Sequence, residues 1–158
     1  MTYASGTEVS VDRSKAEVER LLRKYGATKF LSGWDDRQVV VGFSMNDRQV
    51  KISIPIPSKD DDSVRMTPSG RYIRSEAILI GVWQGAVRQR WRALVLILKA
   101  KLEAVSAGIT TFESEFLGQL VLPGSGGRTV AEMVLPHLDD LPLALPAPTV
   151  DVSREESP

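Results

Sequence analysis

The sequence predicts a single α+β domain in which helices cover one face of a small antiparallel sheet. Two observations carry this prediction: three short apolar segments are separated by two-residue polar turns, and segments with helical periodicity precede and follow them. The chain has 158 residues, of which 42% are hydrophobic, and this is enough for one core with loosely held ends. We expect residues 1–10 to be a flexible N-terminus, residues 11–138 to be the domain, and residues 139–158 to be a disordered tail rich in proline and acids.

The first helix is predicted over residues 15–25. Ser14 is a suitable N-cap because its hydroxyl can accept a hydrogen bond from the first turn, and Glu17 follows it at the spacing of a capping box. Gly26 is suited to the left-handed conformation that commonly ends a helix. Apolar residues recur at helical spacing in this segment, at Val18, Leu21, Leu22 and Tyr25. One side of the helix should therefore be buried.

Three strands are predicted to follow, over residues 28–34, 38–45 and 49–56. The first two are closed by Asp35 with Asp36 and by Asn46 with Asp47, and polar turns of this length favour antiparallel hairpins. The third strand alternates apolar with polar residues, so one of its faces should be buried and the other open. Prolines at its end cannot donate ladder hydrogen bonds, which indicates an edge strand or a strand end.

A polar loop is predicted over residues 58–69. Its three consecutive aspartates lack the spaced ligands and the glycine of a calcium-binding loop, so a solvated loop is the favoured interpretation. Arg74 or Ser75 then begins the longest helix, and Gly108 should end it. The centre of this helix, residues 93–98, is apolar on every side, and a segment of this kind has to be enclosed. We expect it to lie between the sheet and the later helices.

Two shorter helices are predicted in the C-terminal part of the domain. Thr110 or Thr111 can cap the first, and Thr129 can cap the second, which should cover residues 130–138. The glycine-rich turn between them, residues 121–128, does not match a phosphate-binding loop because no Gly-Lys-Ser/Thr follows it.

The composition excludes several classes of chemistry. The chain has no cysteine, which removes disulfides, zinc ribbons and thiol catalysis, and its single histidine, His137, leaves little material for histidine-based metal sites or catalytic triads. No secretory signal is recognisable at the N-terminus, and the longest apolar run is too short to span a bilayer. We therefore expect a cytoplasmic protein that uses no membrane, metal or cofactor.

The charge distribution suits a polyanionic partner. Residues 1–131 hold 19 Lys and Arg against 14 Asp and Glu, whereas residues 132–158 hold one Arg against six acids. From Arg65 to Lys101 there are eight basic residues and a single acid, Glu76. The candidate nucleic-acid contacts are five cations of the long helix: Arg88, Arg90, Arg92, Lys99 and Lys101. Such a row would give salt-sensitive binding without sequence readout.

The same cations have a purely structural interpretation. They are placed to pair with Glu103, Glu113 and Glu115, in which case they would hold the fold together and do nothing more. The element order, one helix, three antiparallel strands and a second helix, is similar to that of double-stranded-RNA-binding domains. The lysine-rich helix motif of that family is absent, and likeness of order alone does not establish a function.

The three tryptophans also have two interpretations. Trp34, Trp83 and Trp91 could supply stacking surfaces for unpaired bases. Helical spacing favours a core position for two of them, in the stripe formed by Trp83, Val87, Trp91, Leu94 and Leu98.

A magnesium-dependent nuclease is a remote alternative. Glu17 or Glu19 on the first helix, Asp36, and the Gln-Val-Lys segment that ends at Lys51 could imitate the acids and lysine of such a site. A protein-interaction module is the closer alternative. Exposed parts of Phe112 and Phe116, or the leucine-rich residues 135–145, could dock on a partner or on a second copy.

Several segments resemble a family of small proteins encoded by bacteriophages and prophages, which has no established activity. The likeness covers most of residues 9–137, and it is carried by residues 16–27, 33–36, 88–94, 99–105 and 108–113. The resemblance implies a setting inside an infected bacterial cell. We expect a binding protein and not an enzyme: a nucleic-acid-binding accessory protein first, and a host-takeover or counter-defence factor that acts through protein contacts second.

Overall fold

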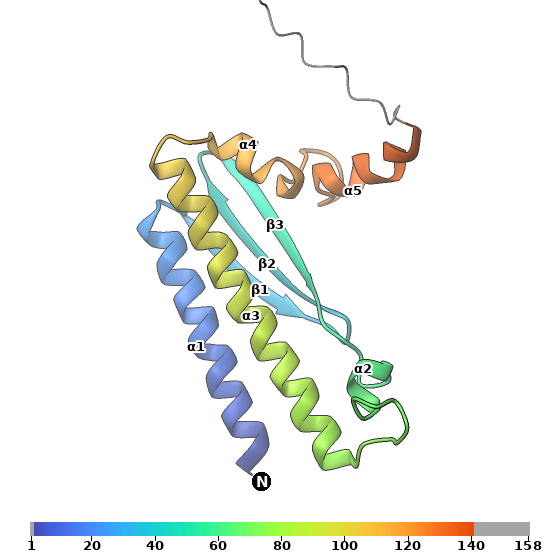
Figure 1. The fold of residues 1–158 in the computed structure, drawn as a ribbon. Coiled ribbons are helices and arrows are strands. Elements are labelled where there is room, and N and C mark those ends of the chain that lie inside the picture. Colours follow the sequence, from blue (N-terminus) through green and yellow to red (C-terminus); the bar gives the residue numbers. More distant parts are fainter. Residues whose placement is uncertain (1, 141–158) are drawn as a thin grey trace, which may run out of the picture.

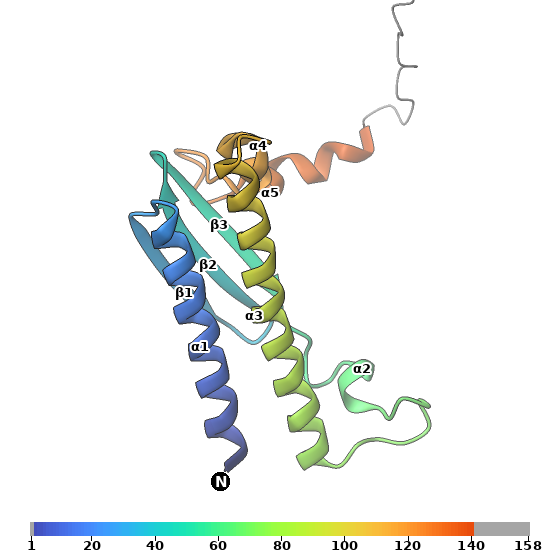
Figure 2. The same cartoon turned by 60° about the vertical axis from the view of Figure 1, so that its left-hand side comes forward.

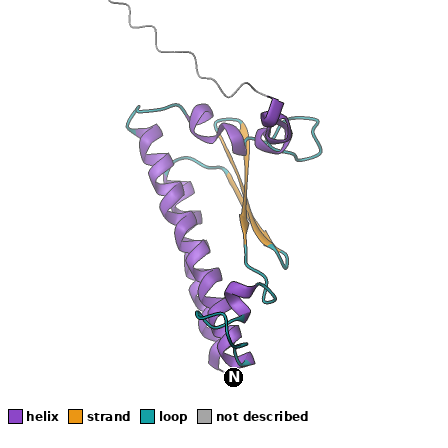
Figure 3. Ribbon diagram, turned by 45° about the vertical axis from the view of Figure 1, so that its right-hand side comes forward, coloured by secondary structure: helices purple, strands orange, loops and turns teal. Residues whose placement is uncertain are grey.

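Residues 2–140 are described in this computed structural model, with side chains from residue 11 onward, and they have the predicted α+β architecture (Figure 1). In chain order the elements are α1 (Thr2–Lys24), β1 (Lys29–Trp34), β2 (Gln38–Met45), β3 (Arg48–Pro55), α2 (Asp62–Arg65), α3 (Glu76–Ser106), α4 (Phe112–Phe116), the 3-10 turn η1 (Leu117–Gln119), α5 (Val130–Val134) and the 3-10 segment η2 (Leu135–Asp140). The sheet is antiparallel with strand order β1-β2-β3. Figure 3 shows α1 and α3 on one side of it.

Alternation along the strands determines which face of the sheet is buried. Every second residue of β2 is in the core, namely Val39, Val41, Phe43 and Met45. Phe43 pairs with Val50 and Val41 pairs with Ile52, so the apolar residues of β3 lie on the same face. The opposite face is largely open, and there the exposed side chain of Leu31 lies over Gly42. Helices α1 and α3 therefore cover one face only, as predicted, and α5 contacts the other face through Lys51.

The two hairpin turns owe their shape to short polar side chains. Asn46 and Asp47 have φ values of 51° and 58°, which is the left-handed conformation that a type I′ hairpin turn requires at both central residues. In the other turn, Asp35 Oδ1 accepts hydrogen bonds of 2.8 Å from the backbone N–H groups of Arg37 and Gln38. Both turns form without a glycine.

Helix α1 begins earlier than predicted. It starts at Thr2, so Ser14 lies inside the helix and is not its N-cap. The predicted end is correct, because Gly26 has φ 101° and the N–H of Ala27 donates to Leu22 O. Figures 1 and 2 show α1 running beside α3 along its length, and in both views the N-terminal halves of the two helices extend beyond the sheet. A neighbouring helix can extend α1 where local capping signals cannot reveal it.

Helix α3 has the predicted bounds but is not enclosed. Ser75 is its N-cap, and Gly108 follows its end with φ 73°. Its inward side is buried, yet the side chains of Leu96 and Ile97 are 67% and 50% exposed. The expectation that the apolar centre lies between sheet and later helices was wrong, because α4 and α5 gather at the C-terminal end of α3 and not along its outer side (Figure 2).

The C-terminal elements follow their predicted caps. The hydroxyl of Thr111 accepts from Ser114 N–H, and Thr129 forms a full capping box with Glu132. At the start of the glycine-rich turn, the N–H of Val121 donates to Gln49 O over 2.8 Å and so extends the edge of β3. The polar loop contains the short helix α2, which was not predicted. Asp139 and Asp140 belong to η2, and the rest of the predicted tail, residues 141–158, lies outside the described residues.

Candidate functional site

The five candidate cations of α3 lie on two different flanks of the helix. Arg92, Lys99 and Glu103 share one line, because they are separated by seven and four residues. Glu103 Oε2 accepts a hydrogen bond of 3.1 Å from the hydroxyl of Tyr25, which follows α1. Partial burial and this hydrogen bond raise the pKa of Tyr25. The flank that carries Arg92 and Lys99 therefore faces α1.

Arg90 and Lys101 lie on the other flank, toward α4. The Lys101 ammonium donates to the backbone oxygen of Glu115 over 2.7 Å and to its carboxylate over 3.1 Å. Lys101 thereby holds α4 against α3, which is the structural interpretation that the sequence left open. Arg88 is half-buried and engaged in an interaction within the chain. Arg90, Arg92 and Lys99 are exposed, and none of them forms an ion pair with another residue in the described part of the chain.

Sequence reasoning missed a second row of cations, on α1. Arg13, Arg20 and Lys24 recur at a spacing of seven and four residues and are exposed on the side opposite Val18 and Leu22, which are buried. The spacing is visible in the sequence. The predicted helix began at residue 15, however, and therefore did not include Arg13. We define the basic helix surface as these three residues together with Arg92 and Lys99.

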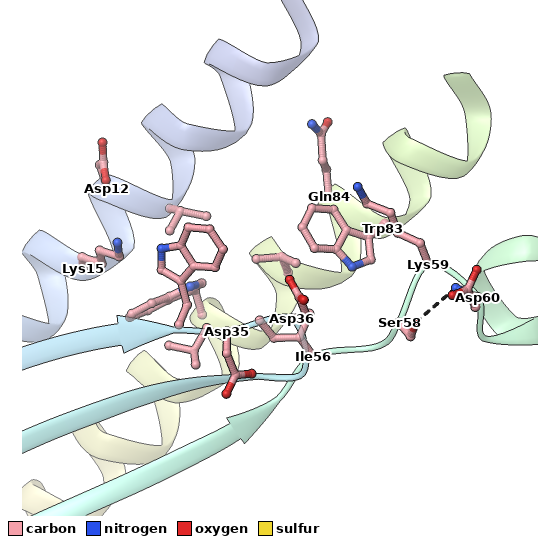
Figure 4. Close-up of a pocket in the computed structure, with 15 residues that line it drawn as sticks. Asp12, Lys15, Asp35, Asp36, Ile56, Ser58, Lys59, Asp60, Trp83 and Gln84 are labelled. Carbon is pink, nitrogen blue, oxygen red and sulfur yellow. Dashed lines mark hydrogen bonds between the residues drawn. The ribbon is translucent and has the colours of Figure 1, made fainter. Parts of the chain in front are cut away.

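A second feature is a cleft that contains every tryptophan of the chain. It has a volume of about 760 Å³ and is lined by parts of α1, the β1–β2 turn, the segment after β3, and α3 (Figure 4). Trp91 is only 2% exposed and belongs to the core as predicted, whereas Trp34 at the end of β1 is 75% exposed. Trp83 is half-buried, and its indole N–H donates to Pro57 O over 2.8 Å. We call this feature the tryptophan cleft.

Charged side chains of both signs line the tryptophan cleft. The carboxylates are Asp12, Asp35, Asp36 and Asp60, and the ammonium groups are Lys15 and Lys59. Each ammonium lies over an indole, Lys15 at 5.7 Å from the Trp91 ring centroid and Lys59 at 4.8 Å from that of Trp83. Hydrogen bonds from the backbone N–H groups of Arg37 and Gln38 lower the pKa of Asp35, so this carboxylate is committed to its turn.

Gln84 is the buried polar residue of the cleft wall. The side chain is 9% exposed, and it forms no hydrogen bond with any described residue. No fully buried side-chain nitrogen or oxygen among the described residues lacks a partner. The small exposed area of Gln84 must therefore include its carboxamide, which Figure 4 shows in the space between α1 and α3.

The structure does not assemble the nuclease-like set. Lys51 pairs with Gly42 and so points away from α1, whereas Glu17 and Glu19 belong to that helix. The Lys51 ammonium instead binds Gly127 O at 2.8 Å and Glu132 Oε2 at 3.0 Å. Within residues 11–140, no group of three or more acidic or histidine side chains is placed to hold a metal ion.

The residues that were predicted to dock on a partner protein are only partly exposed. Phe112 and Phe116 are buried, and their ring centroids lie 4.9 Å apart in the core, so the expectation that they are exposed was wrong. Leu135 and Leu138 are exposed, and residues 141–145 of the same leucine-rich segment are outside the described residues. Ala93, Leu96, Ile97 and Ala100 form an uncharged outer stripe on α3 instead.

No protein-family model, curated protein or solved structure was found to match the chain. Among the described residues, no helix has the length and hydropathy needed to cross a membrane.

Proposed function

We propose that the protein is a phage-type accessory protein that binds nucleic acid without sequence preference through the basic helix surface. The observation that carries the proposal is the presence of exposed cations at helical spacing on each of two neighbouring helices. Arg92 and Lys99 lie on the α3 flank that faces α1, and Arg13, Arg20 and Lys24 lie on the outer side of α1. None of these cations forms an ion pair with another described residue.

The size of the basic helix surface suits a phosphate backbone. Arg13 and Lys24 are separated by eleven residues, which corresponds to roughly 16 Å along a helix, and Arg92 and Lys99 are separated by roughly 10 Å. Two such rows can contact several consecutive phosphates. Contacts of this kind release counterions and carry no information about base sequence. Lys101 has no part in this proposal, because its ammonium is bound to Glu115.

A salt series on a double charge reversal tests the proposal. Arg92→Glu combined with Lys99→Glu should weaken the binding of labelled duplex DNA more than tenfold at low salt. The slope of log affinity against log salt should fall by about 2, because each lost phosphate contact removes about 0.9.

The matched control is Lys29→Glu combined with Arg71→Glu, which makes the same change in net charge at exposed positions outside α1 and α3. This control should keep most of the affinity and the full salt slope. Equal losses of DNA affinity in both double variants would mean that the net charge of the protein, and not the position of Arg92 and Lys99, determines binding. Affinity that survives the Arg92 and Lys99 reversal would remove the proposal.

The outer stripe of α3 favours protein association as a second candidate function. Leu96 and Ile97 are large, apolar and at least half exposed, on a helix side that carries no charge between residues 93 and 100 except at its flanks. Self-association would bring Arg90, Arg92 and Lys99 of two copies together, so a partner with acidic residues beside an apolar helix face suits the stripe better. Leu96→Lys should abolish capture of such a partner and leave DNA affinity in place.

A further inference from the structure

We infer that the tryptophan cleft is a separate binding site, and that its ligand is a guanidinium group, carried by an arginine of a partner protein or by a small guanidine. The inference does not depend on nucleic-acid binding, because it concerns other residues on the inner side of the helix layer.

The charge of the cleft selects a cation. Four carboxylates line it against two ammonium groups, so an anionic ligand such as a phosphate meets a net negative field. Asp35 is occupied by the backbone of its own turn. Asp12 and Asp36 form no ion pair with any described residue and are available to a ligand.

The indole rings select the same kind of ligand. Two of the three already have a lysine ammonium over them, in the geometry of a cation–π contact. Trp34 is the exception: it is 75% exposed, and no described cation lies over its ring. The exposed indole of Trp34 offers a surface for stacking, and Asp36, which also lines the cleft, offers a carboxylate as a charged acceptor.

Gln84 supplies a hydrogen-bond acceptor in the cleft wall. The residue is 9% exposed, and its unpartnered carboxamide is not fully buried, so the oxygen is open to the cleft and can accept a hydrogen bond from a ligand. The cleft is therefore equipped for a ligand that donates several hydrogen bonds.

A guanidinium fits these three features better than an ammonium does. It is planar and stacks flat on an indole, its five N–H donors can serve a carboxylate and a carboxamide together, and it is more weakly hydrated. The cleft volume of about 760 Å³ exceeds the needs of one side chain and falls within the range of about 300–1,000 Å³ typical of ligand sites. There is room for the residues on either side of an arginine in a peptide.

Tryptophan fluorescence is a direct probe, because all three tryptophans line the cleft. The full chain is titrated with the capped tripeptide Gly-Arg-Gly, with the same peptide carrying citrulline, which is the neutral isostere of arginine, and with the lysine peptide. We expect a saturable change with arginine and at least tenfold weaker binding with citrulline. Agmatine in a fourth titration distinguishes a free guanidine from a peptide: tighter binding of the tripeptide assigns the site to a protein partner.

Two variants locate the binding in the cleft, and calorimetry reads them out because one removes a fluorophore. Trp34→Ala and Asp36→Asn are both at exposed positions and should each weaken the arginine peptide at least fivefold. The control is Asp47→Asn, an equal change of charge in the β2–β3 turn, at a φ of 58° that asparagine tolerates. If Trp34→Ala does not fold, Asp36→Asn decides alone.

Equal responses to arginine and citrulline, or wild-type affinity in Asp36→Asn, would overturn the inference. Duplex binding separates this result from the previous proposal. Asp36→Asn should leave DNA affinity and its salt slope unchanged, and the Arg92 and Lys99 reversal should leave peptide affinity unchanged.

Discussion

At the scale of single residues, Glu132 connects two parts of the molecule. Its carboxylate accepts a hydrogen bond of 2.7 Å from the N–H of Thr129 and closes the capping box of α5. The same oxygen lies 3.0 Å from the Lys51 ammonium on β3. The N–H of Thr129 is the main reason why the pKa of Glu132 is lowered, and Lys51 adds to it. One glutamate thus both begins a helix and attaches it to the sheet.

Replacement of Glu132 by glutamine should destabilise the protein in a pH-dependent way. Since the folded pKa is lowered, the carboxylate stabilises the fold fully above the ordinary glutamate pKa of about 4.3, and this stabilisation is lost as pH falls through the lowered pKa. Urea unfolding at neutral pH should therefore show Glu132→Gln as less stable than the wild type, and the difference should shrink at acidic pH. Glu17→Gln, at an exposed position on α1, should show no such trend. A difference that persists unchanged into acid would contradict the assignment.

At the scale of elements, α3 has two apolar sides, of which one is buried and the other is exposed. Leu98 is fully buried against the sheet, and Leu96, two residues earlier, is 67% exposed. Helical spacing places Leu98 in the predicted core stripe, but the expectation of an enclosed helix centre placed Leu96 inside the fold as well. The neighbours of the helix make the distinction: the sheet and α1 cover one side, and no described element covers the outer stripe.

Alanine substitutions at these two positions should therefore differ sharply. Leu98→Ala should lower the free energy of unfolding by about 2–5 kcal/mol, because it leaves a cavity in the core. Leu96→Ala should change it by less than about 0.5 kcal/mol. Both values come from urea or guanidinium unfolding curves on the full chain. A large loss in Leu96→Ala would mean that the outer stripe is already covered by another copy of the chain.

At the scale of the whole molecule, opposite charges are separated along the chain. Residues 1–131 carry the excess of cations, and residues 132–158 hold six acids and one arginine. An acidic segment attached to a domain with an exposed basic surface competes with any external polyanion. The acidic segment should weaken binding at the basic helix surface, because that surface takes an anion. It should not weaken binding at the tryptophan cleft, because the cleft takes a cation.

Removal of residues 141–158 should raise the affinity for duplex DNA several-fold, since three of the six acids lie in that segment. The increase should be largest at low salt and should vanish as salt screens the competition. Binding of the arginine tripeptide should not increase. The measurement is a DNA titration of full-length and shortened chains over the same salt series, and equal affinities at low salt would refute competition by this segment.

Much of the fold was predictable because its signals act over a few residues. The strand alternation, the caps at Thr111 and Thr129, and the stop at Gly108 are local, and each has its predicted effect. The start of α1 was not predictable, because the capping pattern of Ser14 and Glu17 lies inside the helix and the neighbouring α3 supports the turns before it. Lys101 illustrates the same limit for the candidate site: its partner Glu115 is fourteen residues away on another helix.

By itself, the sequence determined the α+β class, the order of the elements and the concentration of cations in the segment that includes α3. Only the tertiary structure decided which cations stay exposed, which side of α3 remains open, and that Trp34, Trp83 and Trp91 meet in one cleft. The physical reason is the separation in sequence between the residues that interact. Turns, caps and alternation depend on neighbours in the chain, whereas exposure and the assembly of a cleft depend on how segments far apart in sequence pack against one another.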